Sequence, residues 1–187
     1  MELRWPSENE LDSYVEALER GWSPNTMDDG AGRIELDAIR RDRRTFPSSL
    51  VDLDASGPTI RLPDGTIAFR IPGYRKWMWD GEFCGSIGLR WQPGTEELPP
   101  HVLGHVGYSV VPWKRRRGYA TAALRAILAD AGAEGLRWIE VTTDVDNVAS
   151  QGVIEAAGGA SVERFTYPPA YGSGEGLRYR IDVTCGV

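Results

Sequence analysis

Trp113–Leu124 reads WKRRRGYATAAL, a stretch in which four consecutive cations run into a glycine and then into small residues typical of a helix. The cations are Lys114 to Arg117, and we predict a helix from Gly118 to about Ala133. The N-terminus of a helix carries a partial positive charge, so four cations are unfavourable there unless an anion completes the site. The cluster is also unexpected because the 187 residues together carry a net charge of −6.

The chemistry of this turn favours a bound polyanion. The first amides of a helix have no partner within the helix, and with the helix dipole they form an anion site. Gly118 allows the backbone to approach a ligand closely, and Ala120 keeps the first helical turn small. We interpret the turn as a pyrophosphate site, and the alternative is a solvated basic turn before a surface helix. Neither the Walker A pattern nor the dinucleotide-binding glycine fingerprint occurs in the chain.

Hydrophobic periodicity and turn signals predict a mixed α/β sheet in a single domain that spans residues 1–187. The predicted strands are Glu2–Trp5, Thr59–Leu62, Thr66–Ile71, Arg75–Trp79, Glu82–Trp91, His105–Val111, Trp138–Thr143, Ser161–Tyr167 and Leu177–Thr184, and the helices are Glu8–Arg20, Ile34–Arg44, Gly118–Ala133 and Val148–Ala157. Asp80-Gly81 between two of these strands is a two-residue hairpin signal. Ser7 and Glu10 match a capping box at the first helix.

Composition and charge exclude several classes of protein. No apolar run approaches the roughly 20 residues that span a bilayer, and the N-terminus is polar. An acidic balance argues against general binding to nucleic acid or to a membrane surface. We therefore expect a cytoplasmic protein in which Cys84 and Cys185 are free thiols. His101 and His105 are the two histidines, and their number makes a histidine-rich metal site unlikely, so no metal is expected.

Two motifs resemble those of the GNAT-type N-acetyltransferases. Arg115-x-x-Gly118-x-Ala120, after a strand and at the start of a helix, resembles the turn with which that family cradles the pyrophosphate of acetyl-CoA. Asn147-x-x-Ser150, followed by Gly158-Gly159, resembles the helix after the family's fifth strand. The resemblance covers roughly residues 75–184 and is greatest to an uncharacterised bacterial branch with GHxGY in the fourth strand, here residues 104–108.

The resemblance implies a fold and a set of cofactor contacts. The fold would be a mixed, mostly antiparallel central sheet with splayed fourth and fifth strands, flanked by helices. Residues 1–58 would form a helical region on the acceptor side, and residues 75–184 would form the cofactor-binding core. The resemblance implies that the pantetheine arm of acetyl-CoA contacts Val110 and Val111, with Asn147 and Ser150 nearby. It implies that the pyrophosphate is bound by the charge of Arg115 and by the amides of Arg116, Arg117, Gly118, Tyr119 and Ala120. Lys114 and Arg116 would be solvated or would reach the ribose phosphate.

The resemblance also implies a reaction without metal, in which a neutral primary amine on a small molecule or a peptide N-terminus attacks the thioester directly. The family's base is often a glutamate on the fourth strand, and His105 stands at that position with an ordinary pKa of about 6.5. His105 could instead be a structural histidine that holds the neighbouring loop, which leaves Glu140 on the next strand as another base.

The general acid is a second open question. The tyrosine that usually donates the proton lies seven residues after the asparagine, where this chain has Ile154. Ser150 occupies the place of a serine proposed for this role in the branch that modifies ribosomal-protein N-termini. Alternatively Ser150 is only a small residue packed near the cofactor, and Tyr108 or Tyr171 donates the proton.

The acceptor pocket is expected to involve the first helix, the strand Trp77–Trp79, Arg90 and the loop Tyr167–Tyr171. A carboxylate on the acceptor would explain Arg90, although a solvated strand end also would. Because many members of the family dimerise, a homodimer is one expected assembly. An acyl-CoA sensor without catalysis and a nucleic-acid binder that uses Lys114–Arg117 are the alternative functions. The acceptor and the acyl length are not identified by the sequence.

Overall fold

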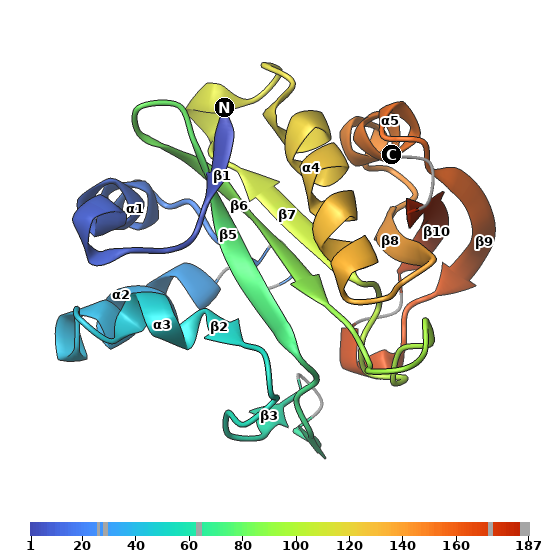
Figure 1. Ribbon diagram of the computed structural model, residues 1–187, viewed down its shortest axis with the longest axis horizontal. Coiled ribbons are helices and arrows are strands. Elements are labelled where there is room, and N and C mark those ends of the chain that lie inside the picture. The colour runs from blue at the N-terminus through green and yellow to red at the C-terminus, as the bar shows by residue number, and fades with distance from the viewer. Residues whose placement is uncertain (26, 28–29, 63–64, 172–173, 184–187) are drawn as a thin grey trace.

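Two antiparallel sheets form the centre of the computed structural model, which describes residues 1–25, 27, 30–62, 65–171 and 174–183 (Figure 1). The first sheet has the order β1-β5-β6-β7, and a short β2 also pairs with β5. Its strands are β1 Glu2–Arg4, β2 Val51–Asp52, β5 Gly73–Trp79, β6 Phe83–Arg90 and β7 Val106–Val110. The predicted hairpin between β5 and β6 is confirmed, but Trp79 pairs with Phe83, so three residues, 80–82, connect the strands instead of the predicted two, with Gly81 at φ +106°.

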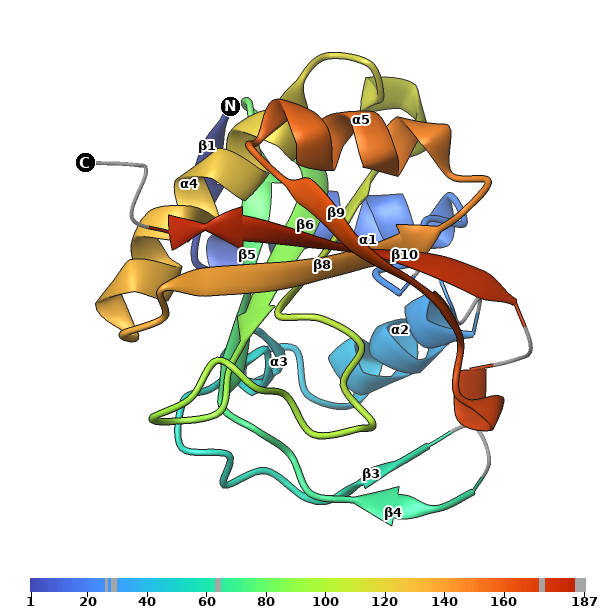
Figure 2. The same ribbon diagram turned by 90° about the vertical axis from the view of Figure 1, so that its right-hand side faces the viewer.

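The second sheet has the order β8-β10-β9 and lies beside the first. Its strands are β8 Trp138–Asp144, β9 Ala160–Thr166 and β10 Glu175–Asp182, and the helix α5 Val148–Ala156 connects β8 to β9 (Figure 2). β7 and β8 are the predicted fourth and fifth strands. They belong to different sheets, so the predicted splay between them is confirmed.

One residue joins the two sheets at the closed end of this splay. The amide of His105 donates to the carbonyl of Glu140 at 2.8 Å, and the amide of Glu140 donates to Nδ1 of His105 at 2.9 Å. Because the second bond goes to a side chain rather than to the next backbone carbonyl, the ladder ends there. Beyond it the edge of β7 that faces β8 has no strand partner among the described residues.

Helices cover both faces of the first sheet. α4 Tyr119–Ala133 covers one face, while η1 Glu8–Glu10, α1 Leu11–Glu19, α2 Ala31–Arg41 and α3 Phe46–Ser49 lie on the other (Figure 1). Side chains alternate along each strand, so Ile87 and Leu89 pack against α4 while Trp77 packs against α1. Trp77 is fully buried and stacks on Tyr14 with ring centroids 4.7 Å apart, so it belongs to the core rather than to a ligand pocket.

The short elements correct several details of the sequence interpretation. The hydroxyl of Ser7 donates to the Glu10 carboxylate at 3.1 Å instead of capping a backbone amide, and the segment begins with the 3-10 turn η1. α3 and β2 were not expected. The remaining short elements are β3 Ile60–Arg61, β4 Ile67–Ala68, η2 Pro112–Lys114 and η3 Pro169–Tyr171. Cys84 is a buried free thiol, whereas Cys185 lies outside the described residues. Within the described ranges, every helix is too short or too polar to cross a lipid bilayer.

Candidate active site

The turn between β7 and α4 presents an open helix N-terminus. Gly118 is the N-cap of α4 and adopts the left-handed conformation, with φ +76°. A Cβ built on Gly118 would meet no atom within 4 Å apart from its two chain neighbours, so there is open space beside this residue. Arg116 is also left-handed, with φ +62°, which is uncommon for a residue with a side chain. Such strain is typical of a backbone held in shape for a ligand.

The four cations of this turn have different surroundings. Lys114 is buried and forms salt bridges with Asp80 and with Glu82, the latter at 2.7 Å. Although burial opposes the charged form, hydrogen bonds to these two carboxylates raise the pKa of Lys114 above its ordinary value. Tyr119 also donates to Asp80. Lys114 therefore clamps the β5–β6 hairpin to the turn, and the expectation of a solvated or phosphate-binding lysine is wrong.

The other three cations are exposed. Nε of Arg115 donates to the carbonyl of Val110 at 3.3 Å, and Arg115, Arg116 and Arg117 form no salt bridge with any described residue. Three guanidinium groups at a helix N-terminus, without a carboxylate among the described residues to neutralise them, repel the dipole and one another. An anion bound among them would offset this repulsion.

The free edge of β7 lies beside this turn. The amide of Arg90 donates to the carbonyl of His105, and the amide of Val111 donates to the carbonyl of Cys84. These two bonds show that alternate residues of β7 from 105 to 111 direct their backbone groups toward β6. The intervening residues, Tyr108 and Val110 among them, therefore direct theirs toward the gap between the sheets.

This geometry supports Val110 as an edge group and corrects Val111. The amide of Val111 is already used in the sheet, its carbonyl accepts from the amide of Lys114 at 3.0 Å, and its side chain is fully buried. Tyr108 was missed as an edge residue. The alternation along the predicted strand could have identified it.

Asn147 and Ser150 come together at the start of α5. Oδ1 of Asn147 accepts from the amide of Ser150 at 3.0 Å and so caps the helix. The hydroxyl of Ser150 lies 2.8 Å from the hydroxyl of Tyr108, which reaches across from β7. Burial raises the pKa of Tyr108 to about 12, so its hydroxyl is protonated at neutral pH. The usual tyrosine position, Ile154, is fully buried in the core.

His105 has the surroundings of a structural histidine. Its ring is fully buried and lies edge-on to Trp138, and Nδ1 accepts a backbone amide. Burial lowers its pKa to about 4, so the ring is neutral at physiological pH. Nε2 is buried without a partner among the described residues. In this conformation the amine substrate does not reach the buried ring. The structure therefore does not support the expected role of His105 as the catalytic base.

Glu140 is also held within the protein. Its carboxylate accepts from Arg178 at 2.7 Å and from Arg180 at 3.1 Å. A carboxylate fixed by two guanidinium groups serves to join β8 to β10 and is poorly placed to take a proton from an amine.

The buried His105 ring predicts a specific dependence of stability on pH. Its folded pKa of about 4 lies below its unfolded value of 6.5, so the unfolded chain binds more protons between these values. Stability is then lost as pH falls through this window, by about 3 kcal/mol at pH 4. Urea unfolding of the wild type and of His105→Asn at about pH 7 and about pH 4 measures this loss.

The wild type is expected to lose about 3 kcal/mol more than His105→Asn over that interval, because the variant lacks the titrating ring. Carboxylates elsewhere titrate in both proteins and cancel in the difference. Equal losses in the two proteins would show that the ring is already able to take a proton in the folded state.

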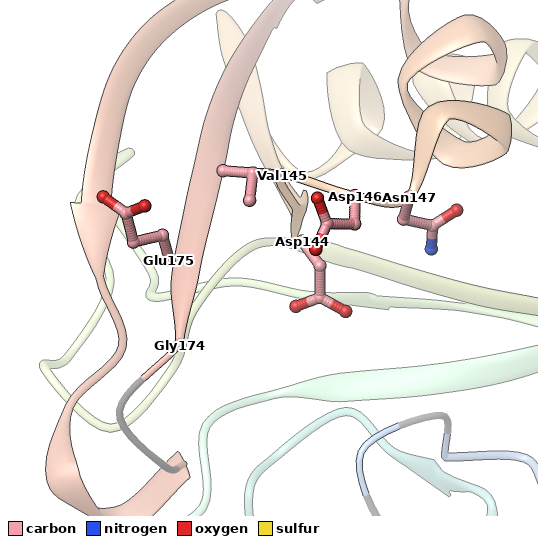
Figure 3. A pocket seen from close by; sticks show the side chains of 6 residues that line it. All are labelled: Asp144, Val145, Asp146, Asn147, Gly174 and Glu175. Atoms are coloured by element: carbon pink, nitrogen blue, oxygen red, sulfur yellow. The ribbon is translucent and has the colours of Figure 1, made fainter.

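A hollow lies beyond the open end of the splay. Its volume is about 540 Å³, and it is lined by Asp144, Val145, Asp146, Asn147, Gly174 and Glu175 (Figure 3). Asp144 and Glu175 point away from each other, and Glu175 pairs with Arg164 at 2.6 Å. Within the described part of the chain, no group of three or more His, Cys, Asp or Glu side chains could hold a metal ion.

A second polar cluster lies on the face of the first sheet that carries α1 and α2. Nη1 of Arg75 lies 2.7 Å from Glu35 on α2 and 3.2 Å from the hydroxyl of Tyr14, which itself donates to Glu35. Nε1 of Trp22 donates to the Ser109 hydroxyl at 2.9 Å. These bonds tie α1, α2 and the loop between them to β5 and β7, on the side where the acceptor is expected.

Comparison with known proteins identifies the domain type. A family model described as an acetyltransferase (GNAT) domain matches residues 64–160. Among curated proteins, none matches this chain.

Several solved structures share the fold. A microcin C7 self-immunity acetyltransferase in complex with acetyl-CoA and AMP is 9% identical, with a TM-score of 0.62 over 96% of this chain and 91% of that one. A ribosomal L7/L12 α-N-protein acetyltransferase in complex with coenzyme A is 12% identical, with a TM-score of 0.59 over 96% and 92%. A spermidine N-acetyltransferase mutant from Vibrio cholerae is 12% identical, with a TM-score of 0.57 over 100% and 98%. At such identities the likeness establishes the fold.

Proposed function

The chain belongs to the GNAT acetyltransferase family, and from that premise we propose that it transfers the acetyl group of acetyl-CoA to a primary amine. The amine would be carried by a small molecule or a peptide N-terminus. The observation that carries this proposal is the set of three exposed arginines around the N-terminus of α4, which form no salt bridge with the described residues. An acyl-CoA brings the pyrophosphate that such a site needs.

The residues of the turn fit this co-substrate. The amides from Arg116 to Ala120 would bind the pyrophosphate, and Arg115 would add charge beside it. Open space beside the left-handed Gly118 supports this, because a phosphate could approach the backbone there. The pantetheine arm would pair with the free edge of β7 at Tyr108 and Val110, and Asn147 would donate a hydrogen bond from its side-chain amide.

The chemistry needs few groups. The nitrogen of a neutral amine bonds to the thioester carbonyl carbon, the carbon–sulfur bond breaks, and the departing thiolate takes a proton. Ser150 would donate that proton, and its contact with Tyr108 supports this role, since Tyr108 can donate to its hydroxyl and leave the serine hydrogen free. The surplus proton of the amine goes to water, and water returns one proton to the serine oxygen through Tyr108, so that Ser150 ends the step as a hydroxyl. His105 would keep open the splay that admits the substrates.

Binding and turnover of acetyl-CoA test this proposal. A ligand present at about 100 times its dissociation constant stabilises the native state by about 2.7 kcal/mol. For a chain of this length we expect the melting temperature to rise by about 5–10 °C. Release of free thiol on addition of primary amines measures the transfer.

The buried His105 and the core position of Ile154 favour one alternative function, an acyl-CoA sensor without catalysis. This alternative predicts the same rise in melting temperature with no thiol release for any amine. Absence of both the rise and the release would rule out the two functions together.

A further inference from the structure

Arg90 lies on the acceptor side of the sheet and forms no salt bridge with the described part of the chain. It is the last residue of β6, and alternation with the buried Ile87 and Leu89 places its side chain on the face that carries α1 and α2. The guanidinium crosses to the neighbouring strand, where Nη2 would lie 3.1 Å from a Cβ built on Gly107.

No described carboxylate pairs with Arg90, and no described group accepts a hydrogen bond from its guanidinium. Arg75 on the same face differs, since Glu35 neutralises it. Loss of surrounding water is the main cause that lowers the pKa of Arg90; the electrostatic interaction with Tyr171 raises it, and repulsion from Arg75 lowers it. The side chain is nevertheless exposed. Solute can therefore reach a cation that protein surrounds and does not neutralise.

The strands beside Arg90 carry glycines on the same face. Gly88 of β6 and Gly107 of β7 are register partners, and Arg75 of β5 pairs with Gly88. Two adjacent strands thus present no side chain between the two arginines on this face. Ser109 lies two residues after Gly107 on β7, and its hydroxyl accepts a hydrogen bond from Trp22. These two side chains border the glycine positions at that end. Gly107 also precedes Tyr108, whose hydroxyl contacts Ser150.

We propose that the amine acceptor carries a carboxylate and that Arg90 binds it, an inference that rests on the proposed function and names its substrate class. The planar guanidinium fork matches a carboxylate in two parallel hydrogen bonds. The guanidinium lies over Gly107, and the rest of a small acceptor would lie between this anchor and the splay. Because Arg75 is already neutralised, Arg90 provides the charge that selects the acceptor.

Matched pairs of acceptors test this directly. Glycine, β-alanine and γ-aminobutyrate, each with its carboxamide, vary the spacing between amine and carboxylate. We expect the wild type to favour the carboxylate in at least one pair by roughly ten- to hundredfold in kcat/KM. Arg90→Gln should remove that preference through KM of the carboxylate and leave KM for acetyl-CoA unchanged. Arg61→Gln, an exposed arginine of the β3–β4 hairpin, is the control and should keep the preference.

The outcomes separate this inference from the proposed function. A preference that survives in Arg90→Gln, or an equal rate for both members of every pair, would overturn the role of Arg90 while acetyl transfer still stands. If acetyl-CoA raises the melting temperature and only other amines react, the carboxylate class is overturned. A preference for 2-aminoethylphosphonate over every carboxylate would equally overturn it. Absence of the rise in melting temperature would instead count against the proposed function.

Discussion

Gly118→Asn is expected to lower the affinity for acetyl-CoA by about 100-fold or more while the protein stays folded. Asparagine tolerates the left-handed conformation better than other residues with a side chain, so the backbone strain is small. The added side chain points into the space that has no protein atom within 4 Å and that we assign to the pyrophosphate. Losing two charge-assisted hydrogen bonds costs about 3–6 kcal/mol, which accounts for the size of the effect. Titration calorimetry with acetyl-CoA measures it.

Gly135→Asn is the matched control at the other end of the same helix. Gly135 is also left-handed, with φ +83°, and a Cβ there would also meet nothing within 4 Å. Both variants carry the same backbone change in open space, and only one lies at the proposed site. Equal affinities of the two variants for acetyl-CoA would mean that the N-terminus of α4 does not bind the phosphates.

Local signals in the sequence were sufficient for most elements of the fold. Asp80-Gly81 marks the β5–β6 hairpin, and Gly118 marks the start of α4. Both depend on residues that are adjacent in the chain, so neighbouring positions carry the information. The contact of Asn147 with Ser150 was predictable for the same reason, since it is formed within one helical turn.

Contacts between distant residues were not predictable in this way. The four cations of Lys114–Arg117 look equivalent in the sequence, yet the hairpin supplies Asp80 and Glu82 to the first of them alone. Nothing near Lys114 in the chain signals these partners. The Ser7–Glu10 pattern failed for a related reason, because Glu10 is also bound by Arg4 at 2.5 Å.

Burial decided the interpretation of His105 and Val111. A histidine beside a predicted strand can face a substrate or a neighbouring strand, and the sequence pattern is the same in both cases. The ring of His105 packs against Trp138, and its Nδ1 accepts the amide of Glu140 where the β7–β8 pairing ends. Val111 could have been excluded earlier, since strand alternation assigns Val110 and Val111 to opposite edges.

Ser150→Ala is expected to lower kcat by about 100-fold with little change in KM for acetyl-CoA. Protonation of a leaving group by a positioned side chain contributes about 10²- to 10⁴-fold, and a serine hydroxyl belongs at the low end. The side chain is small and half-buried, and the helix cap depends on the Ser150 amide rather than on its hydroxyl. The loss should therefore appear in the chemical step rather than in stability.

Tyr108→Phe should lower kcat by about 10-fold, because the phenol orients the serine hydroxyl rather than donating to the sulfur itself. Combined with Ser150→Ala it should cause no further loss, since residues that act as one unit are not additive. Tyr179→Phe is the control, as this buried tyrosine donates to Glu155 on the same helix at 3.3 Å. If the two losses multiply in the double variant, Tyr108 acts independently of Ser150. If kcat is unchanged in Ser150→Ala, the proton donor is another group.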